Sequence, residues 1–175
     1  MQRFLITITL LALLALSACR AASYFSQGIE HHELGQYEEA IADYNEAIRL
    51  RPDDADAYLY RGRAHNGLGE YEEAIADYDE AIQLQPDFVE AYFNRGFAYA
   101  DLGRYEEATA DYDEAIQLQP DLADAYYKRG VAHTHLGRYE ESITDLETAL
   151  ELAQTTGNDD LAAKIGKALK AVRNP

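Results

Sequence analysis

The sequence predicts an all-α fold, a solenoid of four helix-turn-helix repeats closed by a C-terminal helix. The first observation is a set of prolines that recur every 34 residues, Pro52, Pro86 and Pro120. The second is a set of glycines with the same period, Gly35, Gly69, Gly103 and Gly137. A fixed period of this length is typical of a stacked array, in which each unit buries its apolar face against its neighbours.

Residues 1–18 come first, and we predict that they form a lipoprotein signal peptide. A short basic start, Met1 to Arg3, precedes an uncharged stretch from Phe4 to Leu16. This order is typical of a secretion signal. A retained membrane anchor is the alternative, but a spanning helix needs about 20 apolar residues and this stretch is shorter.

The only cysteine, Cys19, ends the motif Leu16-Ser17-Ala18-Cys19. This motif resembles the lipobox of bacterial lipoproteins, in which the cysteine thiol receives a lipid and becomes the mature N-terminus. An ordinary signal-peptidase site wants a small residue at the third-last position, which Leu16 would occupy. The alternative is that Cys19 is a chance apolar residue.

The lipobox resemblance implies that residues 19–20 are the lipidated N-terminus of an exported protein. Several acyl chains, palmitate among them, would tether the protein to the bacterial cell envelope without spanning the membrane. In Gram-negative lipoproteins an aspartate after the cysteine commonly retains the protein at the inner membrane, and Arg20 stands there instead. We therefore expect the outer membrane, where the host has one.

Aligning the chain on its period gives four units, 21–54, 55–88, 89–122 and 123–156. The units repeat columns of tyrosine, glycine and alanine, which in the first unit are Tyr24, Gly28, Tyr37, Ala40 and Tyr44. The fourth unit carries Ser142 and Leu146 in the last two of these columns. This pattern resembles the tetratricopeptide repeat, and the resemblance covers residues 21–156. It implies a right-handed solenoid in which the first helix of each unit, helix A, lines the concave face.

Glycines inside the predicted A helices indicate close helix packing. Glycine within a helix costs about 1 kcal/mol relative to alanine, so four in register need a structural reason. They are Gly28, Gly62, Gly96 and Gly130. We expect them to face the small side chains of the Ala40 column in the second helix of each unit, helix B.

The ends of the helices are also predicted locally. Gly35 and its equivalents are expected to end helix A, and the acidic pair after Tyr37 suits the first turn of helix B. Asp87 and Glu90 have the spacing of a capping box for the next helix A.

Charged residues recur with the repeats. Three units carry an arginine before the helix A glycine, Arg61, Arg95 and Arg129, and helix B carries Asp43, Asp77, Asp111 and Asp145. We predict that these arginines pair with these aspartates between packed helices, as part of the fold and not as a binding site.

Residues 157–175 are predicted to form a capping helix that starts near Asp159. Its apolar stripe, Leu161, Ile165, Leu169 and Val172, would cover the open face of the last repeat. A basic face carries Lys164, Lys167, Lys170 and Arg173. That face either attracts an acidic partner or is simply solvated.

Composition and motifs argue against several classes of function. The formal net charge of -17 should repel nucleic acid, although such a charge also serves solubility alone. His31, His65 and His133 share a column with Tyr99, which indicates a packing position and no metal site. The chain lacks a nucleophile elbow, a phosphate-binding loop and a recognisable carboxylate pair, so we expect neither an enzyme nor a cofactor.

The tetratricopeptide resemblance places a partner-binding groove on the A helices. The fifth residues of the units are Phe25, Leu59, Phe93 and Tyr127, and the ninth are Ile29, Arg63, Phe97 and Val131. Asn94 and Lys128 add polar groups, and an acidic edge carries Asp56, Glu90 and Asp124. The alternative for Phe93 and Tyr127 is that they pack on each other. The clamp that binds chaperone tails is absent, because Phe25 and Ile29 replace its lysine and asparagine.

These observations predict a protein–protein interaction scaffold or adaptor. It would be a membrane-tethered lipoprotein that binds a partner peptide or helix in its concave groove, in a role such as envelope assembly. The alternative is a self-assembling structural envelope protein, in which the groove or the cap surface of one copy meets another copy.

Overall fold

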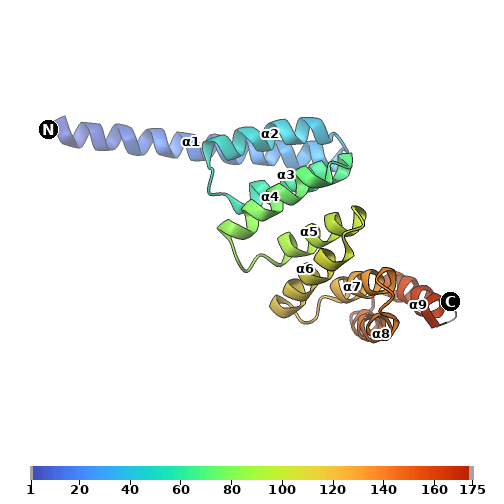
Figure 1. Ribbon diagram of the computed structural model, residues 1–175. Helices are drawn as coiled ribbons and strands as arrows, with labels where there is room; N and C mark the ends of the chain where they lie inside the picture. The colour runs from blue at the N-terminus through green and yellow to red at the C-terminus, as the bar shows by residue number, and fades with distance from the viewer. Residues whose placement is uncertain (1, 174–175) are drawn as a thin grey trace. The chain divides into compact units, whose positions relative to one another are not determined.

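The structure is a computed structural model that describes residues 2–173, and of residues 2–15 the backbone alone (Figure 1). Met1 of the predicted signal peptide and residues 174–175 of the predicted cap lie outside this range. The described chain contains helices and no strand, so the all-α prediction is confirmed. The helices are α1 (Gln2–Glu33), α2 (Tyr37–Leu50), α3 (Ala55–Leu68), α4 (Tyr71–Leu84), α5 (Val89–Asp101), α6 (Tyr105–Leu118), α7 (Ala123–His135), α8 (Tyr139–Thr155) and α9 (Asp159–Arg173).

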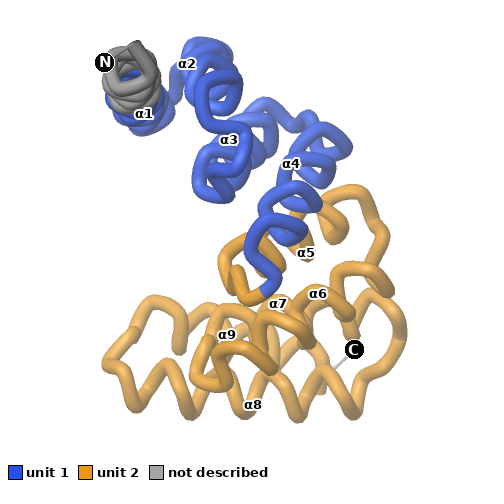
Figure 2. The backbone as a smooth tube through the Cα atoms, turned by 90° about the vertical axis from the view of Figure 1, so that its left-hand side faces the viewer, with its two compact units in different colours: residues 1–86 blue, residues 87–175 orange. Residues whose placement is uncertain are grey.

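The chain divides into two compact units, residues 1–86 with α1 to α4 and residues 87–175 with α5 to α9 (Figure 2). Within each unit, the A and B helices of a repeat pack against each other as a pair. Such a division is expected of a linear array, because each repeat packs only on its neighbours and no single core holds the whole chain.

Left-handed glycines end the A helices, as predicted. Gly35 has φ 73° and Gly69 has φ 78°, a conformation that glycine adopts without the steric cost of a Cβ atom. The Gly35 amide donates to the His32 carbonyl at 3.0 Å, and the Gln36 amide donates to the His31 carbonyl at 2.9 Å. These bonds satisfy carbonyls of the last turn and turn the chain into helix B.

The capping box predicted at Asp87 is wrong. Helix α5 begins at Val89, its N-cap is Phe88, and no side chain caps the helix. Phe88 is 8% exposed. Because its ring is buried at the N-cap position, Asp87 lies one residue too early to bond the first turn.

Aromatic side chains of the B helices fill the spaces under the A helices. Tyr44, Tyr78 and Tyr112 are fully buried, and Leu146 takes the same place in the last repeat. The predicted close approach of helix A is confirmed, since a Cβ atom on Gly28 would lie 2.5 Å from the ring of Tyr44. The nearest groups are the tyrosines of helix B, with Leu146 in the last repeat, rather than the predicted alanines. Gly96 also meets the alanine column, since a Cβ atom on it would lie 3.2 Å from the Ala108 carbonyl oxygen.

The predicted arginine–aspartate pairs are confirmed in three repeats. The Arg61, Arg95 and Arg129 guanidinium groups each donate two or more bonds to an aspartate of the following B helix, at 2.5–3.1 Å. Those aspartates are Asp77, Asp111 and Asp145. In the first repeat Gln27 replaces the arginine, and Asp43 bonds the His31 ring at 2.7 Å instead.

The C-terminal helix α9 covers the end of the last repeat. Leu161, Ile165 and Leu169 are buried in one cluster with Leu146 and Ala149 of α8. The Asn158 side chain accepts a hydrogen bond from the Leu161 amide at 3.1 Å and so caps the helix. The apolar stripe predicted for the cap therefore packs as expected.

Candidate functional site

In residues 1–86, the predicted groove residues contact the aromatic groups beneath them. The ring of Phe25 lies 5.3 Å from Tyr60, edge to face, and 5.8 Å from Tyr44. Arg63 is exposed, and its guanidinium lies 5.2 Å from the Tyr60 ring centroid. Leu59 is only 3% exposed, so its side chain belongs to the core and offers no surface to a partner. Ile29 is half-buried beside the same aromatic cluster.

In residues 87–175, two of the large groove residues are held by the protein itself. The ring of Phe93 lies 5.8 Å from Tyr112, and Tyr127 packs against the cluster that joins α8 and α9. Both are half-buried. The Asn94 amide donates to the Glu90 carbonyl at 2.6 Å within α5. These residues therefore contribute to stability, whatever they contribute to binding.

The other three groove residues of this unit share a hollow between α5, α6 and α7. Its volume is about 170 Å³, and its lining includes Phe97, Lys128 and Val131. Tyr105, Tyr112 and His135 complete its aromatic walls. We call this space the aromatic hollow. Sequence reasoning missed Tyr105 because it considered helix A of each unit without helix B of the preceding one. It missed His135, the last residue of α7, because this position was not among the helix A positions expected to face the groove.

Stacked rings form one wall of the aromatic hollow. The rings of Tyr105 and His135 are parallel within 1°, with centroids 4.3 Å apart. At the equivalent contact in residues 1–86, glycine stands in place of the histidine and Tyr37 in place of Tyr105. A Cβ atom on Gly67 would lie 2.7 Å from the ring of Tyr37. Gly67 is thus a second kind of close-packing glycine, which the four-fold glycine column did not reveal.

Lys128 brings a positive charge to the aromatic hollow. Its ammonium lies 4.3 Å from the centroid of the Phe97 ring, an attractive cation–π geometry. Burial lowers the pKa of Lys128, while the charges of Asp101 and Asp124 oppose that shift. The amine is therefore a hydrogen-bond donor whose charge is partly balanced by two acidic neighbours.

Tyr112 adds a buried hydroxyl beside the same hollow. Burial raises the pKa of Tyr112, so the phenol keeps its proton at neutral pH. The hydroxyl has no hydrogen-bond partner among the described residues, and the same holds for Tyr44 and Tyr78. A buried hydroxyl without a partner costs about 1–3 kcal/mol.

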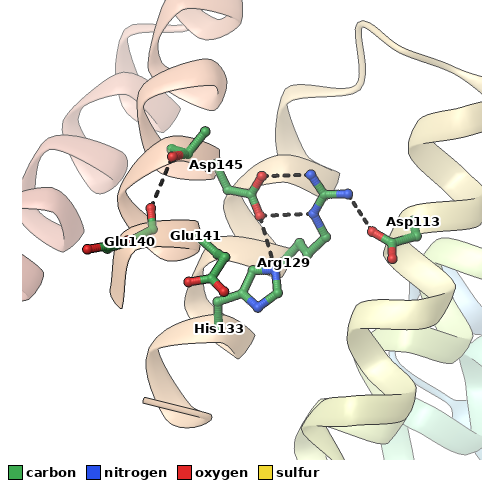
Figure 3. A pocket seen from close by; sticks show the side chains of 7 residues that line it. Asp113, Arg129, His133, Glu140, Glu141 and Asp145 are labelled. Atoms are coloured by element: carbon green, nitrogen blue, oxygen red, sulfur yellow. Dashed lines mark hydrogen bonds and ion pairs between the residues drawn. The ribbon is translucent and has the colours of Figure 1, made fainter. Parts of the chain in front are cut away.

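A second, polar hollow of about 400 Å³ lies where α6, α7 and α8 meet. Figure 3 shows Arg129 between Asp145 and Asp113, with the His133 ring beside Asp145. His133 Nε2 lies 3.6 Å from the Asp145 carboxylate. Glu140 and Glu141 complete the acidic lining. We call this space the acidic hollow.

Histidines of the shared column serve packing and hydrogen bonding. The His65 ring bonds Glu70 at 2.7 Å and lies 3.9 Å from Asp77. Burial lowers the pKa of His133, with Arg129 adding to the effect and Asp145 opposing it. Within the described residues, no three His, Cys, Asp or Glu side chains come together as a metal site would require.

The predicted lipidation residue Cys19 is exposed within α1. Ala21, two residues later, is 2% exposed and begins the packed part of the first repeat, whereas Leu16 is 59% exposed. In Figure 1, α1 extends beyond the end of α2 on this N-terminal side. In the part of the chain that the structure describes, no helix combines the length and apolar character needed to cross a membrane.

Comparisons with known proteins identify the repeats. A family model described as TPR repeat matches residues 28–69, 62–103 and 98–137. A second model, described as tetratricopeptide repeat, matches residues 123–155. A search of curated proteins gave no match.

Solved structures give the same fold. A crystal structure of MamA is 25% identical, covers 79% of this chain and 81% of its own, and has a TM-score of 0.76. The TPR domain of Arabidopsis OM64 is 28% identical, covers 68% and 98%, and has a TM-score of 0.67. The first TPR of Spaghetti (RPAP3), bound to the HSP90 peptide SRMEEVD, is 26% identical, covers 69% and 95%, and has a TM-score of 0.67.

Proposed function

The chain belongs to the tetratricopeptide repeat family, and from this premise we propose that it is a membrane-tethered scaffold that binds a partner peptide or helix in its groove. The fold is typical of protein–protein interaction scaffolds, which are generally not enzymes. A similar domain binds a peptide, as the complex of RPAP3 with SRMEEVD illustrates. Neither catalysis nor a cofactor is part of the proposal.

The aromatic hollow is the observation that carries the binding proposal. It has room for one apolar side chain of a partner, and its walls come from three successive helices. Such a hollow, apolar with a few convergent polar groups, is the usual form of a binding site. Lys128 and Asp101 supply those polar groups, while Tyr112 is part of the aromatic lining.

The acidic edge predicted for the groove would favour a partner segment of particular composition. Glu90 and Asp124 are exposed, and they would favour a segment that carries lysine or arginine beside its apolar anchor. Their attraction is screened by salt, so binding should weaken as the ionic strength rises.

The membrane tether is proposed from the lipobox and from the position of Cys19. Cleavage before Cys19 would remove residues 1–18 and would keep Ala21, which is buried at the start of the first repeat. A lipid on Cys19 would then hold the scaffold at the cell envelope, as an adaptor for assembly there.

Selection of peptides tests the binding proposal. Peptides chosen from a random library on the purified protein would be measured by fluorescence anisotropy against Val131→Trp, whose indole fills the aromatic hollow. We expect at least a tenfold weaker affinity, while Ala110→Trp on the exposed face of α6 leaves affinity unchanged. Equal affinities for the two variants, at equal thermal stability, would refute binding in the hollow.

A further inference from the structure

Helix α9 presents a basic face on an acidic protein. Residues 161–173 contain four basic residues and no acidic one, whereas the rest of the chain holds all 32 acidic residues against 11 basic ones. Lys164, Lys167, Lys170 and Arg173 are exposed. Because Leu161, Ile165 and Leu169 are buried against α8, the lysines are left on the outer side of the helix.

The acidic hollow has the opposite character. Its lining carries four carboxylates and one arginine. Arg129 is already engaged by Asp145 and Asp113. Glu140 and Glu141 are exposed and form no ion pair within the described part of the chain. The acidic hollow therefore carries more negative than positive charge, and it is large enough to admit a lysine side chain.

The two charged surfaces belong to the same compact unit but do not neutralise each other within one copy. The hollow is lined by α6, α7 and α8, and no residue of α9 contributes to it. On α9, Arg173 pairs with Glu147 of α8, which lies outside the hollow. Lys164 and Lys167 on α9 and the acidic hollow are therefore both exposed in the same copy.

We propose that the basic face of α9 in one copy docks on the acidic hollow of a second copy. Lysine side chains are long and flexible enough to reach Glu140 and Glu141 while their stems cover the small exposed residues Ala163 and Gly166 of α9. A contact between two different patches is heterologous, so it leaves a free basic face and a free hollow at the ends of the pair. Association is therefore open-ended and grows with concentration.

A second copy fits these surfaces better than other occupants. An anionic membrane or an unrelated acidic protein would meet the basic face but leave the acidic hollow unused. A contact between two copies uses both kinds of surface, because the basic face of one copy meets the acidic hollow of the other, which is deep enough for a lysine side chain to enter. None of the residues of this association lines the aromatic hollow, although the charge of Lys164 helps to lower the pKa of Lys128, which does.

Exchanging the charges tests the proposal. One variant carries Lys164→Glu and Lys167→Glu, and the other carries Glu140→Lys and Glu141→Lys. The full chain of each would be studied by sedimentation velocity at low salt, in non-ionic detergent with micelles in large excess. We expect the wild-type mass to rise with concentration and to fall to that of one copy in high salt. Each variant alone should stay a single copy, and an equimolar mixture of the two should associate again.

Recovery in the mixture is the decisive outcome, because it cannot arise from misfolding of either variant. A wild-type protein that remains a single copy at every concentration would overturn the proposal. So would a basic-face variant that associates as well as the wild type. Binding of the wild type, but not of that variant, to vesicles of phosphatidylglycerol and phosphatidylcholine, without self-association, would assign the basic face to a membrane surface instead.

Discussion

Substituting Gly96 tests how the A and B helices pack. A Cβ atom there would lie 2.9 Å from the Tyr112 ring and 3.2 Å from the Ala108 carbonyl oxygen. Alanine inside a helix gains about 1 kcal/mol over glycine, but overpacking a core costs about 1–3 kcal/mol. Gly96→Ala should therefore be neutral or destabilising by up to about 2 kcal/mol, and Gly96→Leu should cost about 3 kcal/mol or more.

A matched control lies in the same unit. Gly166 is an exposed glycine of α9, and a Cβ atom on it would meet nothing within 4 Å. Gly166→Ala should stabilise the protein by up to about 1 kcal/mol, which corresponds to about 2–4 °C in Tm. Thermal unfolding followed by circular dichroism would compare the variants. If Gly96→Ala raises Tm as much as Gly166→Ala does, the contact with Tyr112 is not what selects glycine.

Three further outcomes are expected. Arg129→Ala leaves Asp145, whose side chain is 8% exposed, without its charged partner. The free energy of unfolding, measured with urea, should fall by about 2–3 kcal/mol. Arg49→Ala, which removes an exposed pair, should leave the urea midpoint unchanged. Cys19→Ala should move the protein out of the membrane fraction or leave it unprocessed, and unchanged fractionation and mature size would contradict lipidation. Burial raises the pKa of Tyr44, Tyr78 and Tyr112 in the B helices, so the folded state holds their protons more tightly than the unfolded state does. The stability of the fold should therefore decrease as the pH rises above about 10. Absorbance at alkaline pH should show these phenols ionising only as the protein unfolds, and ionisation without unfolding would contradict their burial.

The architecture was predictable because the same structural requirements recur in each repeat and therefore appear several times in the sequence. A glycine with φ near 75° recurs at each A–B turn, and an arginine meets an aspartate in three repeats. Each requirement is local or is shared by neighbouring units, so columns in one sequence suffice to show it.

The register between packed helices was not predictable in the same way. The glycine column could face either the alanines or the tyrosines of helix B, and only the crossing of the helices decides that Gly28 meets Tyr44. The same limit applies to Leu59, which shares its column with half-buried Phe25 but is itself in the core. Spacing identifies a helix face, whereas packing decides how much of that face remains open.

The candidate site shows where sequence reasoning stops. Phe93 and Tyr127 were expected to line the partner-binding groove, yet Tyr112 and the α9 cluster already contact them. Replacing both with alanine would therefore lower stability as well as any binding, and Val131 is the better position for a test. The walls formed by Tyr105 and His135 depend on the contact between α6 and α7, which no column within one repeat reveals.

The central claim is that a partner binds in the aromatic hollow, and covalent capture of that partner by a group placed in the hollow tests it most directly. A photo-crosslinking amino acid placed at position 131, in cells that make the protein, should yield a discrete adduct with a partner. The same amino acid at position 110, on the exposed face of α6, should not. Identical adducts from both positions, or none from position 131 while position 167 on α9 captures a partner, would contradict binding in the hollow.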